Sequence, residues 1–292
     1  ISAATISPTR SVSFGDGNGV SASLPVAGNA GNLLTRIAAA AVLAPLVLGA
    51  IYLGGWAYAA LLGLAAFLAL HEWQMIVGPG AGRRLVVFPI AVLAVSLAIS
   101  LAAAGAGLLA LAVAAIAVLA VGKGLGHRHS GPESIGIAHL GGPVIALWWL
   151  RSASVGGFAV VLWLFLIVWA TDIGGYFVGK GIGGPKLAPR ISPKKTWSGL
   201  VGAMAAAAAV AALLGAAFEY PAVPSAILGA VMAVVAQLGD LFESAIKRRF
   251  DVKDSGALIP GHGGILDRID GLLTAAPALA VVMIISHARI GA

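Results

Sequence analysis

The sequence predicts an all-α polytopic integral membrane protein with about nine transmembrane helices, a cytoplasmic N-terminus and a C-terminus outside. Two observations of composition support this fold class. Of the 292 residues, 60% are hydrophobic and only 10% are charged, whereas a soluble domain carries about 25% charge. The stretch 91–121 contains no charged residue and exceeds the ~20 residues needed to cross a bilayer. A transmembrane barrel would instead alternate apolar and polar residues.

Glycines, prolines and charge clusters divide the apolar sequence into separate spans. Residues 1–32 are rich in Ser, Gly, Pro and Asn, so we expect a flexible tail there. We expect N-terminal membrane helices over 33–155 and a C-terminal catalytic unit with two cytoplasmic loops over 156–292. The breaks at 54–55 and 104–105 are weak glycine turns, so eight or ten spans also remain open. The nine expected spans are about 35–53, 56–77, 85–103, 106–121, 136–150, 156–178, 198–217, 222–246 and 272–290.

The basic residues predict the orientation of these spans. When alternate loops are assigned to the two sides of the membrane, sixteen of the 18 Lys and Arg residues fall on one side. Only Arg151 and Arg289 fall on the other. The positive-inside rule therefore places the N-terminus in the cytoplasm. The net charge of +7 then faces anionic lipid and does not indicate a nucleic-acid partner.

Two predicted cytoplasmic loops, 170–199 and 239–270, contain most of the polar chemistry. In the second loop, Asp240, Ser244 and Lys247 recur at helical spacing and share one face, while Glu243 and Lys247 form an i, i+4 pair. A solvated helix end explains Glu243 adequately. The glycines at 263–264 permit positive φ or close backbone approach. Glu72, near the inner end of the second span, is equally well explained as a helix-end group that reaches water.

Several Asp residues close to several Lys and Arg residues suit a polyphosphate with a bound metal. Carboxylate oxygens hold Mg²⁺, which takes its remaining ligands from water and phosphate, and Lys and Arg neutralise phosphate charge. Zinc is not expected, because no His and Cys set has ligand spacing. The absence of cysteine excludes disulfides and thiol catalysis.

The first loop adds a second cationic cluster. The stretch "GKGIGGPK" (179–186) lacks the spacing of a phosphate-binding glycine loop and is better explained as a flexible turn. In "SPKKTWSG" (192–199), Ser192 and Pro193 predict a turn, two lysines follow, and Thr196 and Trp197 lead into the next span. An interfacial Trp beside positive-inside lysines is the alternative explanation.

The stretch "SAIKRRFDVKDSGALIPGHGGILDRID" (244–270) resembles the signature of the phosphatidate cytidylyltransferases, also called CDP-diacylglycerol synthases. The upstream "DIGGYFVGK" (172–180) and "LAPRISPKKTW" (187–197) also resemble this family, with Gly175 and Ser198 departing from its usual Ala and Glu. The resemblance is detailed over about 170–270. The matching signature positions are Ser244, Lys247, Arg248, Lys253, Asp254, Gly256, Pro260, His262, Gly263, Gly264, Asp267, Arg268 and Asp270.

The resemblance implies transfer of a cytidylyl group from CTP to phosphatidate, with Mg²⁺ as cofactor and a second cation left open. It implies membrane lipid as a partner, allows a homodimer, and suggests a bacterial inner membrane with the site on its cytoplasmic side. We expect Asp240 and Asp267 to be the metal ligands, because Asp240 lies at the end of a span and Asp267 begins the next approach to the membrane. The other acidic candidates, as ligands or as holders of Lys and Arg, are Asp172, Asp254 and Asp270. The other expected catalytic residues are Lys247, Arg248, Lys253, Asp254, His262, Arg268 and Asp270. The expected substrate-binding residues are Asp172, Ser192, Lys194, Lys195, Thr196, Ser244, Gly263 and Gly264.

Two other functions compete with this expectation. A transporter of an anionic solute would also use intramembrane acids and cytoplasmic cations, but it usually has a midplane site between repeated halves, and the sequence shows no repeat. A CDP-alcohol phosphotransferase would need an Asp-Gly-x2-Ala-Arg motif, which "DGLL" (270–273) does not continue.

Overall fold

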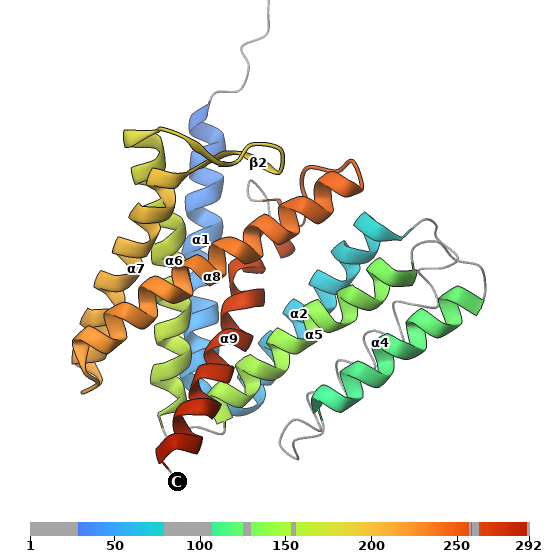
Figure 1. Ribbon diagram of the computed structural model, residues 1–292, viewed down its shortest axis with the longest axis horizontal. Coiled ribbons are helices and arrows are strands. Elements are labelled where there is room, and N and C mark those ends of the chain that lie inside the picture. The colour runs from blue at the N-terminus through green and yellow to red at the C-terminus, as the bar shows by residue number, and fades with distance from the viewer. Residues whose placement is uncertain are drawn as a thin grey trace, which may run out of the picture.

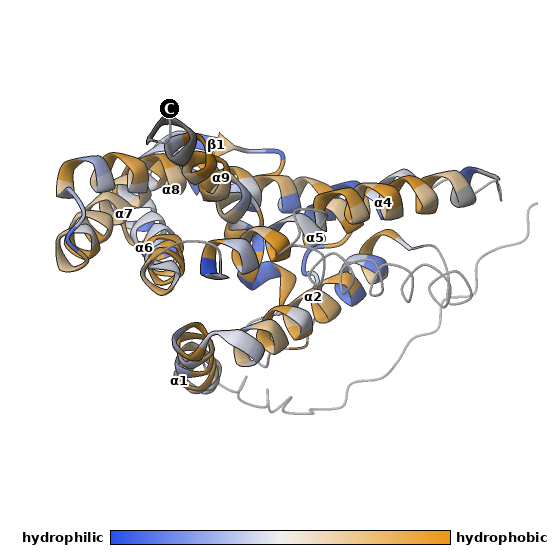
Figure 2. Ribbon diagram, turned by 90° about the horizontal axis from the view of Figure 1, so that it is seen from below, coloured by the Kyte–Doolittle hydropathy of each residue, from blue (hydrophilic) through white to orange (hydrophobic). Residues whose placement is uncertain are grey.

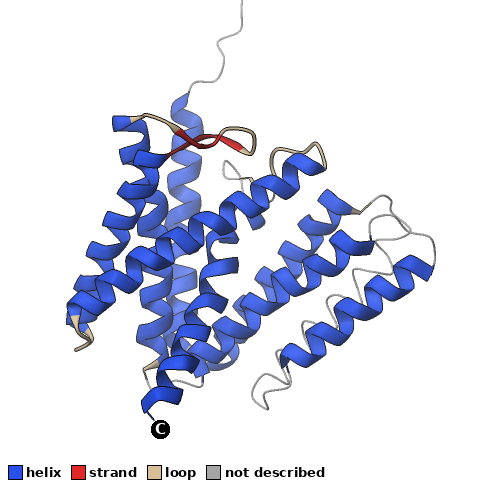
Figure 3. Ribbon diagram, viewed as in Figure 1, coloured by secondary structure: helices blue, strands red, loops and turns tan. Residues whose placement is uncertain are grey.

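The computed structural model describes residues 29–78, 107–124, 130–152, 156–256, 258 and 263–290. Within these ranges the fold is helical, with one small β-hairpin (Figures 1 and 3). Five of the helices are long and apolar enough to cross a membrane. The elements are α1 (Asn29–Leu53), α2 (Gly55–Val77), α4 (Gly107–Gly124), α5 (Ser130–Ser152), α6 (Gly157–Ile182), β1 (Lys186–Ala188), β2 (Ser192–Thr196), α7 (Trp197–Ala217), α8 (Ala222–Arg249) and α9 (Leu266–Ile290).

The chain is a helical membrane protein, as its composition predicts. Eight of the nine expected spans coincide with described helices, and the remaining span, 85–103, lies outside the described residues. Large hydrophobic side chains such as Trp56, Leu213 and Val223 are exposed on α2, α7 and α8, and Figure 2 shows apolar residues along the helices. A bilayer solvates such surfaces, and helices satisfy their own backbone polar groups inside it.

Close packing of α6, α7 and α8 depends on small residues. A Cβ added to Gly174 of α6 would lie 2.5 Å from Ala206 Cβ and 2.7 Å from Gly202 O on α7. A Cβ added to Gly229 of α8 would similarly meet Ala211 of α7. Without a hydrophobic driving force in lipid, small residues let helix backbones approach and gain van der Waals contact. These three helices therefore form a tightly packed framework beneath the hairpin.

A second packed region connects α2, α5 and α9. Its fully buried side chains include Tyr58 and Trp73 of α2 and Leu140 of α5. The Trp73 indole donates a hydrogen bond to Pro132 O (3.0 Å). Arg151, at the end of α5, donates to Ile51 O (2.9 Å), so it binds carbonyl groups at the end of α1, where a cation is favourable.

The structure corrects the sequence-based boundaries at the two polar loops. The stretch with Ser192 and Pro193, expected to turn, is strand β2, which pairs antiparallel with β1. Helix α6 continues to Ile182, and part of the "GKGIGGPK" turn is therefore helical. Helix α9 begins at Leu266, six residues before the expected span, so Asp267 lies in its first turn. Helix α1 begins at Asn29, before the predicted end of the tail, and residues 1–28 lie outside the described residues.

Candidate functional site

A cavity of about 620 Å³ lies where α6 ends, the hairpin crosses and α7 begins. Figure 1 places the hairpin at one end of the helices, opposite the marked C-terminal end. The cavity is therefore at a polar end of the membrane helices. Its lining residues are Asp172, Gly175, Tyr176, Gly179, Lys180, Lys186, Ser192, Lys194, Lys195, Thr196, Gly199, Leu200, Gln237 and Asp240.

Four lysines make the cavity wall strongly basic. Lys180 comes from the last turns of α6, Lys186 from β1, and Lys194 and Lys195 from β2. Lys180 Nζ donates a hydrogen bond to the Tyr176 hydroxyl (3.3 Å) one helical turn earlier. Two carboxylates, Asp172 of α6 and Asp240 of α8, line the same cavity. The wall thus carries a net positive charge, which suits an anion with several phosphates.

Asp240 connects the hairpin to α8. Its Oδ2 lies 2.6 Å from Lys195 Nζ, and its Oδ1 accepts a hydrogen bond from Ser244 Oγ (3.3 Å) one turn later. The predicted shared face of Asp240 and Ser244 is therefore confirmed. Lys195 is 16% exposed and Asp240 30% exposed, so the pair is partly shielded from water. This geometry holds the Lys195 ammonium group at the cavity wall.

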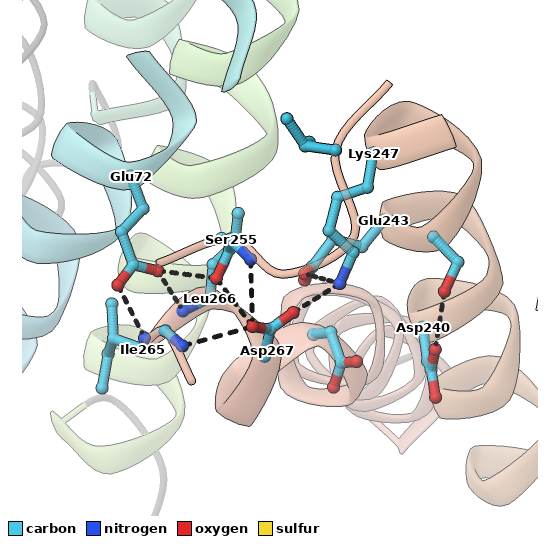
Figure 4. A network of polar contacts seen from close by, with 12 residues as sticks. Glu72, Asp240, Glu243, Lys247, Ser255, Ile265, Leu266 and Asp267 are labelled. Atoms are coloured by element: carbon cyan, nitrogen blue, oxygen red, sulfur yellow. Dashed lines mark hydrogen bonds and ion pairs between the residues drawn. The ribbon is translucent and has the colours of Figure 1, made fainter. Parts of the chain in front are cut away.

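Asp267 occupies a second polar network, beside the beginning of α9 (Figure 4). Its Oδ1 accepts a hydrogen bond from Lys247 Nζ. Its Oδ2 accepts from the backbone N–H of Ser255 (3.1 Å) and of Gly264 (3.2 Å), and lies 3.0 Å from Ser255 Oγ. Asp267 is thus held by one donor from α8 and by donors from the segment between α8 and α9.

Lys247 lies between two carboxylates in this network. Besides Asp267, it donates to Glu243 Oε1 (2.9 Å), the expected i, i+4 pair. Glu243 is 1% exposed, so its interpretation as part of a solvated helix end is wrong. Its other oxygen, Oε2, is buried and has no hydrogen-bond partner among the described residues. The burial follows from the packing of α8 against α9, which a local sequence pattern does not reveal.

Further carboxylates connect the two networks electrostatically. Asp270 lies within range of charge repulsion from Asp240, Glu243 and Asp172, and Asp172 lies within range of attraction by Lys195 and Arg268. In the described part of the chain, no three His, Asp or Glu side chains are arranged to hold a metal by themselves. Mg²⁺, however, is commonly held by one or two carboxylates together with water and substrate phosphates. Hard oxygen donors, including the unpaired Glu243 Oε2, therefore fit a divalent cation chemically.

The two aspartates expected to share a metal have different lysine partners in the structure. Asp240 is in the ion pair with Lys195, whereas Asp267 is in the ion pair with Lys247. Asp240 is therefore paired with Lys195, whereas Asp267 shares Lys247 with Glu243. The two lysines come from different elements, β2 and α8. This pairing depends on how the hairpin lies against α8, and spacing along the sequence does not reveal it.

The remaining predicted residues have several different environments. Thr196 is buried, and its Oγ1 accepts from Gly199 N (3.1 Å), so this hydroxyl caps α7. Gly263 has φ +86°, as its motif predicts. A Cβ on Gly264 would overlap Ser255 Oγ and Glu72 Oε2, which confirms the expected close approach. The exposed residues are Lys194, Arg248, Lys253, Asp254 and Arg268, while His262 and Pro260 lie outside the described residues.

Sequence reasoning missed the role of Glu72. This residue of α2 is 2% exposed, so the interpretation as a helix-end group reaching water is wrong. Its carboxylate accepts hydrogen bonds from Ile265 N (2.9 Å) and Leu266 N (2.9 Å), and Ser255 Oγ lies 2.9 Å from it (Figure 4). The available signal was an acid within an apolar span, which usually has a partner or a function.

Comparison with known proteins shows the family of this chain. The sequence profile of the Cytidylyltransferase family matches residues 34–286. A protein named phosphatidate cytidylyltransferase from Brucella suis biovar 1 (strain 1330) is 47% identical over 152 residues, 51% of this chain and 56% of that protein. A protein of the same name from Rickettsia bellii (strain RML369-C) is 42% identical over 50% of this chain and 66% of its own length. Another from Bacillus subtilis (strain 168) is 43% identical over 44% of this chain and 49% of its own length.

The chain therefore belongs to the cytidylyltransferase family. It spans about half the length of the first curated relatives that it matches.

Proposed function

We propose that the protein is a phosphatidate cytidylyltransferase, which converts CTP and phosphatidate into CDP-diacylglycerol and pyrophosphate. The observation that carries this proposal is the cavity with four lysines at a polar end of apolar helices. A water-soluble triphosphate and a lipid phosphate can both reach such a position. The names of the bacterial relatives, phosphatidate cytidylyltransferase, support the same reaction.

The reaction requires no nucleophile from the protein. An oxygen of the phosphatidate phosphate attacks the α-phosphorus of CTP. The bond from the α-phosphorus to the oxygen bridging to the β-phosphorus breaks, and pyrophosphate leaves with that oxygen and its electron pair. Catalysis then consists mainly of positioning and charge stabilisation. The lysines of the hairpin and α6 supply positive charge for the phosphates and the leaving group.

Within the cavity, Lys195 has the best-defined position. Its ion pair with Asp240 restricts the ammonium group, and ordering before the substrate binds lowers the entropy cost of binding. Lys180, Lys186 and Lys194 complete a cationic wall for the triphosphate. Ser192 is half-buried in the same wall and offers a hydroxyl donor. In the second network, Lys247 donates to the Asp267 carboxylate and so orients it.

The proposal includes Mg²⁺, with a second cation left open. Asp240 and Asp267 would hold the metal, and bound Mg²⁺ would neutralise charge on the triphosphate and the pyrophosphate. Because both aspartates are ion-paired with lysines in this structure, we expect that binding of the metal-nucleotide displaces those lysines toward the phosphates. Chelation with EDTA, followed by titration of Mg²⁺, tests the requirement directly.

The proposed topology has nine spans, a cytoplasmic N-terminus and an external C-terminus. Two observations support it. The hairpin and the C-terminal end of α9 lie at opposite ends of the helices (Figure 1). When alternate loops of the sequence are assigned to the two sides of the membrane, sixteen of the 18 basic residues fall on the cytoplasmic side. The proposed location is a bacterial inner membrane, with the cavity facing the cytoplasm, and the proposal leaves a homodimer open. Cysteine labelling from each side of the membrane would test the orientation.

One assay separates the proposed function from its rivals. Purified protein in detergent is incubated with α-labelled CTP, phosphatidate and Mg²⁺, and the lipid phase and pyrophosphate are measured. Label in a cytidine-containing lipid together with pyrophosphate release supports the proposal. Solute uptake into liposomes without turnover would indicate a transporter, and label transfer only from CDP-diacylglycerol to an alcohol would indicate the phosphotransferase.

A further inference from the structure

Glu72 of α2 has no part in the reaction proposed above, yet it is among the most buried charged groups of the described residues. No Lys or Arg pairs with it in the part of the chain that the structure describes. A buried carboxylate without a cation is costly unless hydrogen bonds compensate it. Its compensation comes from three donors, all from the segment 255–266, nearly 200 residues later.

The contacts of Glu72 determine where α9 begins. The backbone N–H groups of Ile265 and Leu266, which have no partner within the helix, donate to its two carboxylate oxygens at 2.9 Å. A negative charge at this position also interacts favourably with the helix dipole. Glu72 therefore caps α9 from a different helix. The first turn of α9 contains Asp267, so the same contacts fix the backbone that carries this aspartate.

A second route connects Glu72 to Asp267 through one hydroxyl. Ser255 Oγ lies 2.9 Å from Glu72 Oε2 and 3.0 Å from Asp267 Oδ2. Ser255 is buried, and its single hydroxyl proton is shared between the two carboxylates. Asp267 in turn accepts from Lys247. Figure 4 shows this continuous series of hydrogen bonds from Glu72 through Ser255 and Asp267 to Lys247.

Two glycines leave the space that this series of hydrogen bonds requires. A Cβ on Gly256 would lie 2.8 Å from Glu72 Oε1, and a Cβ on Gly264 would overlap Glu72 Oε2. Both glycines belong to the signature stretch 244–270. Part of that signature is therefore shaped around a side chain from the N-terminal helices, where the resemblance to the family is least detailed.

We propose that Glu72 is a positioning residue for the cytidylyl transfer, which orients Asp267 and Lys247 through Ser255 and the N-terminus of α9. The inference rests on the proposed function for the reaction that it affects. It assigns α2 a defined role, because the N-terminal helices hold the loop of the C-terminal site in place. Glu72 touches neither substrate and acts only through these residues.

The test compares Glu72→Gln with a control on the same helix, Gln74→Leu. Glutamine keeps the size of Glu72 but replaces one acceptor oxygen with an NH₂ group that faces donors. Gln74 is also buried, and its amide has no hydrogen-bond partner among the described residues. We expect Glu72→Gln to lower kcat about 10- to 100-fold, the usual range for residues that orient a site, with unchanged KM for both substrates. We expect Gln74→Leu to keep the wild-type kcat.

Two further readouts separate positioning from a merely structural role. Amide hydrogen exchange, measured without substrate or metal, should accelerate at 263–268 in Glu72→Gln and not in Gln74→Leu. In a double-mutant cycle with Ser255→Ala, the combined loss of kcat should be smaller than the product of the two single losses, because both act on Asp267. Independent losses that multiply, or an unchanged kcat in folded Glu72→Gln, would overturn the proposal.

The design remains decisive if one variant fails. If Glu72→Gln does not fold, Ser255→Ala carries the test alone: a lowered kcat with faster exchange at 263–268 supports the proposal, and wild-type values for both overturn it. Wild-type protein is assayed first. If it makes no cytidine-containing lipid, the proposed function fails, while exchange at 263–268 still reports whether Glu72 holds the loop.

Discussion

Replacement of Lys247 by Met should strongly destabilise the protein. Lys247 donates to Glu243 at 2.9 Å and also to Asp267, and the side chains of Lys247, Glu243 and Asp267 are only 10%, 1% and 12% exposed. Removing one partner of a buried ion pair typically costs about 3–5 kcal/mol, because it leaves an uncompensated charge. Asp267 keeps its donors from Ser255 and Gly264. Most of the lost stability should therefore come from the Glu243 carboxylate, which is left without its cation.

The origin of that loss can be tested by a second substitution. Replacing a buried ion pair with apolar residues of similar volume is often neutral or stabilising. Adding Glu243→Leu to Lys247→Met should therefore recover most of the lost stability. Lys253→Met is the matched control, since Lys253 is exposed and surface substitutions usually change stability by no more than about 0.5 kcal/mol.

The assay is reversible unfolding in mixed micelles with an increasing fraction of SDS, followed by circular dichroism. The free energies of unfolding of wild type, Lys247→Met, the double variant and Lys253→Met are compared at one reference composition. If Lys247→Met costs no more than Lys253→Met, or if the double variant is no more stable than Lys247→Met alone, the uncompensated charge of Glu243 is not the cause.

Four other outcomes are expected. Lys195→Met should weaken CTP binding by roughly 10- to 160-fold, equivalent to the loss of one charged hydrogen bond of about 1.5–3 kcal/mol; equilibrium binding of labelled CTP measures this. Asp267→Asn should abolish lipid-linked CMP formation in detergent while the circular dichroism spectrum stays that of a folded helical protein; full activity would remove Asp267 from the mechanism. Gly174→Ala should cost about 1–3 kcal/mol by overpacking the α6–α7 contact, whereas Gly181→Ala, with open space around its Cβ, should cost nothing in the same unfolding assay. EDTA should stop turnover and added Mg²⁺ should restore it, as followed by pyrophosphate release.

Much of the fold was predictable because the bilayer restricts what a sequence can form. Apolar stretches of sufficient length must be helices in lipid, so the span 222–246 matches α8 (Ala222–Arg249) closely. The beginning of α9 was predicted too late, because the prediction treated Asp267 as a loop residue. In the structure, carboxylates satisfy the free N–H groups there, which allows the helix to begin at Leu266. The hairpin was missed because two strands of three and five residues have no clear periodic pattern.

The sequence by itself determined the helical membrane architecture, the concentration of charge in two loops, and the candidate residues, because these follow from composition and local spacing. The i, i+4 pair of Glu243 and Lys247 was also readable from local spacing. Only the tertiary structure decided that Lys195 pairs with Asp240, that Lys247 pairs with Asp267, and that Glu72 caps α9. The physical reason is that ion-pair partners and burial depend on which helices pack together, and residues such as Glu72 and Ser255 meet across 183 positions of sequence.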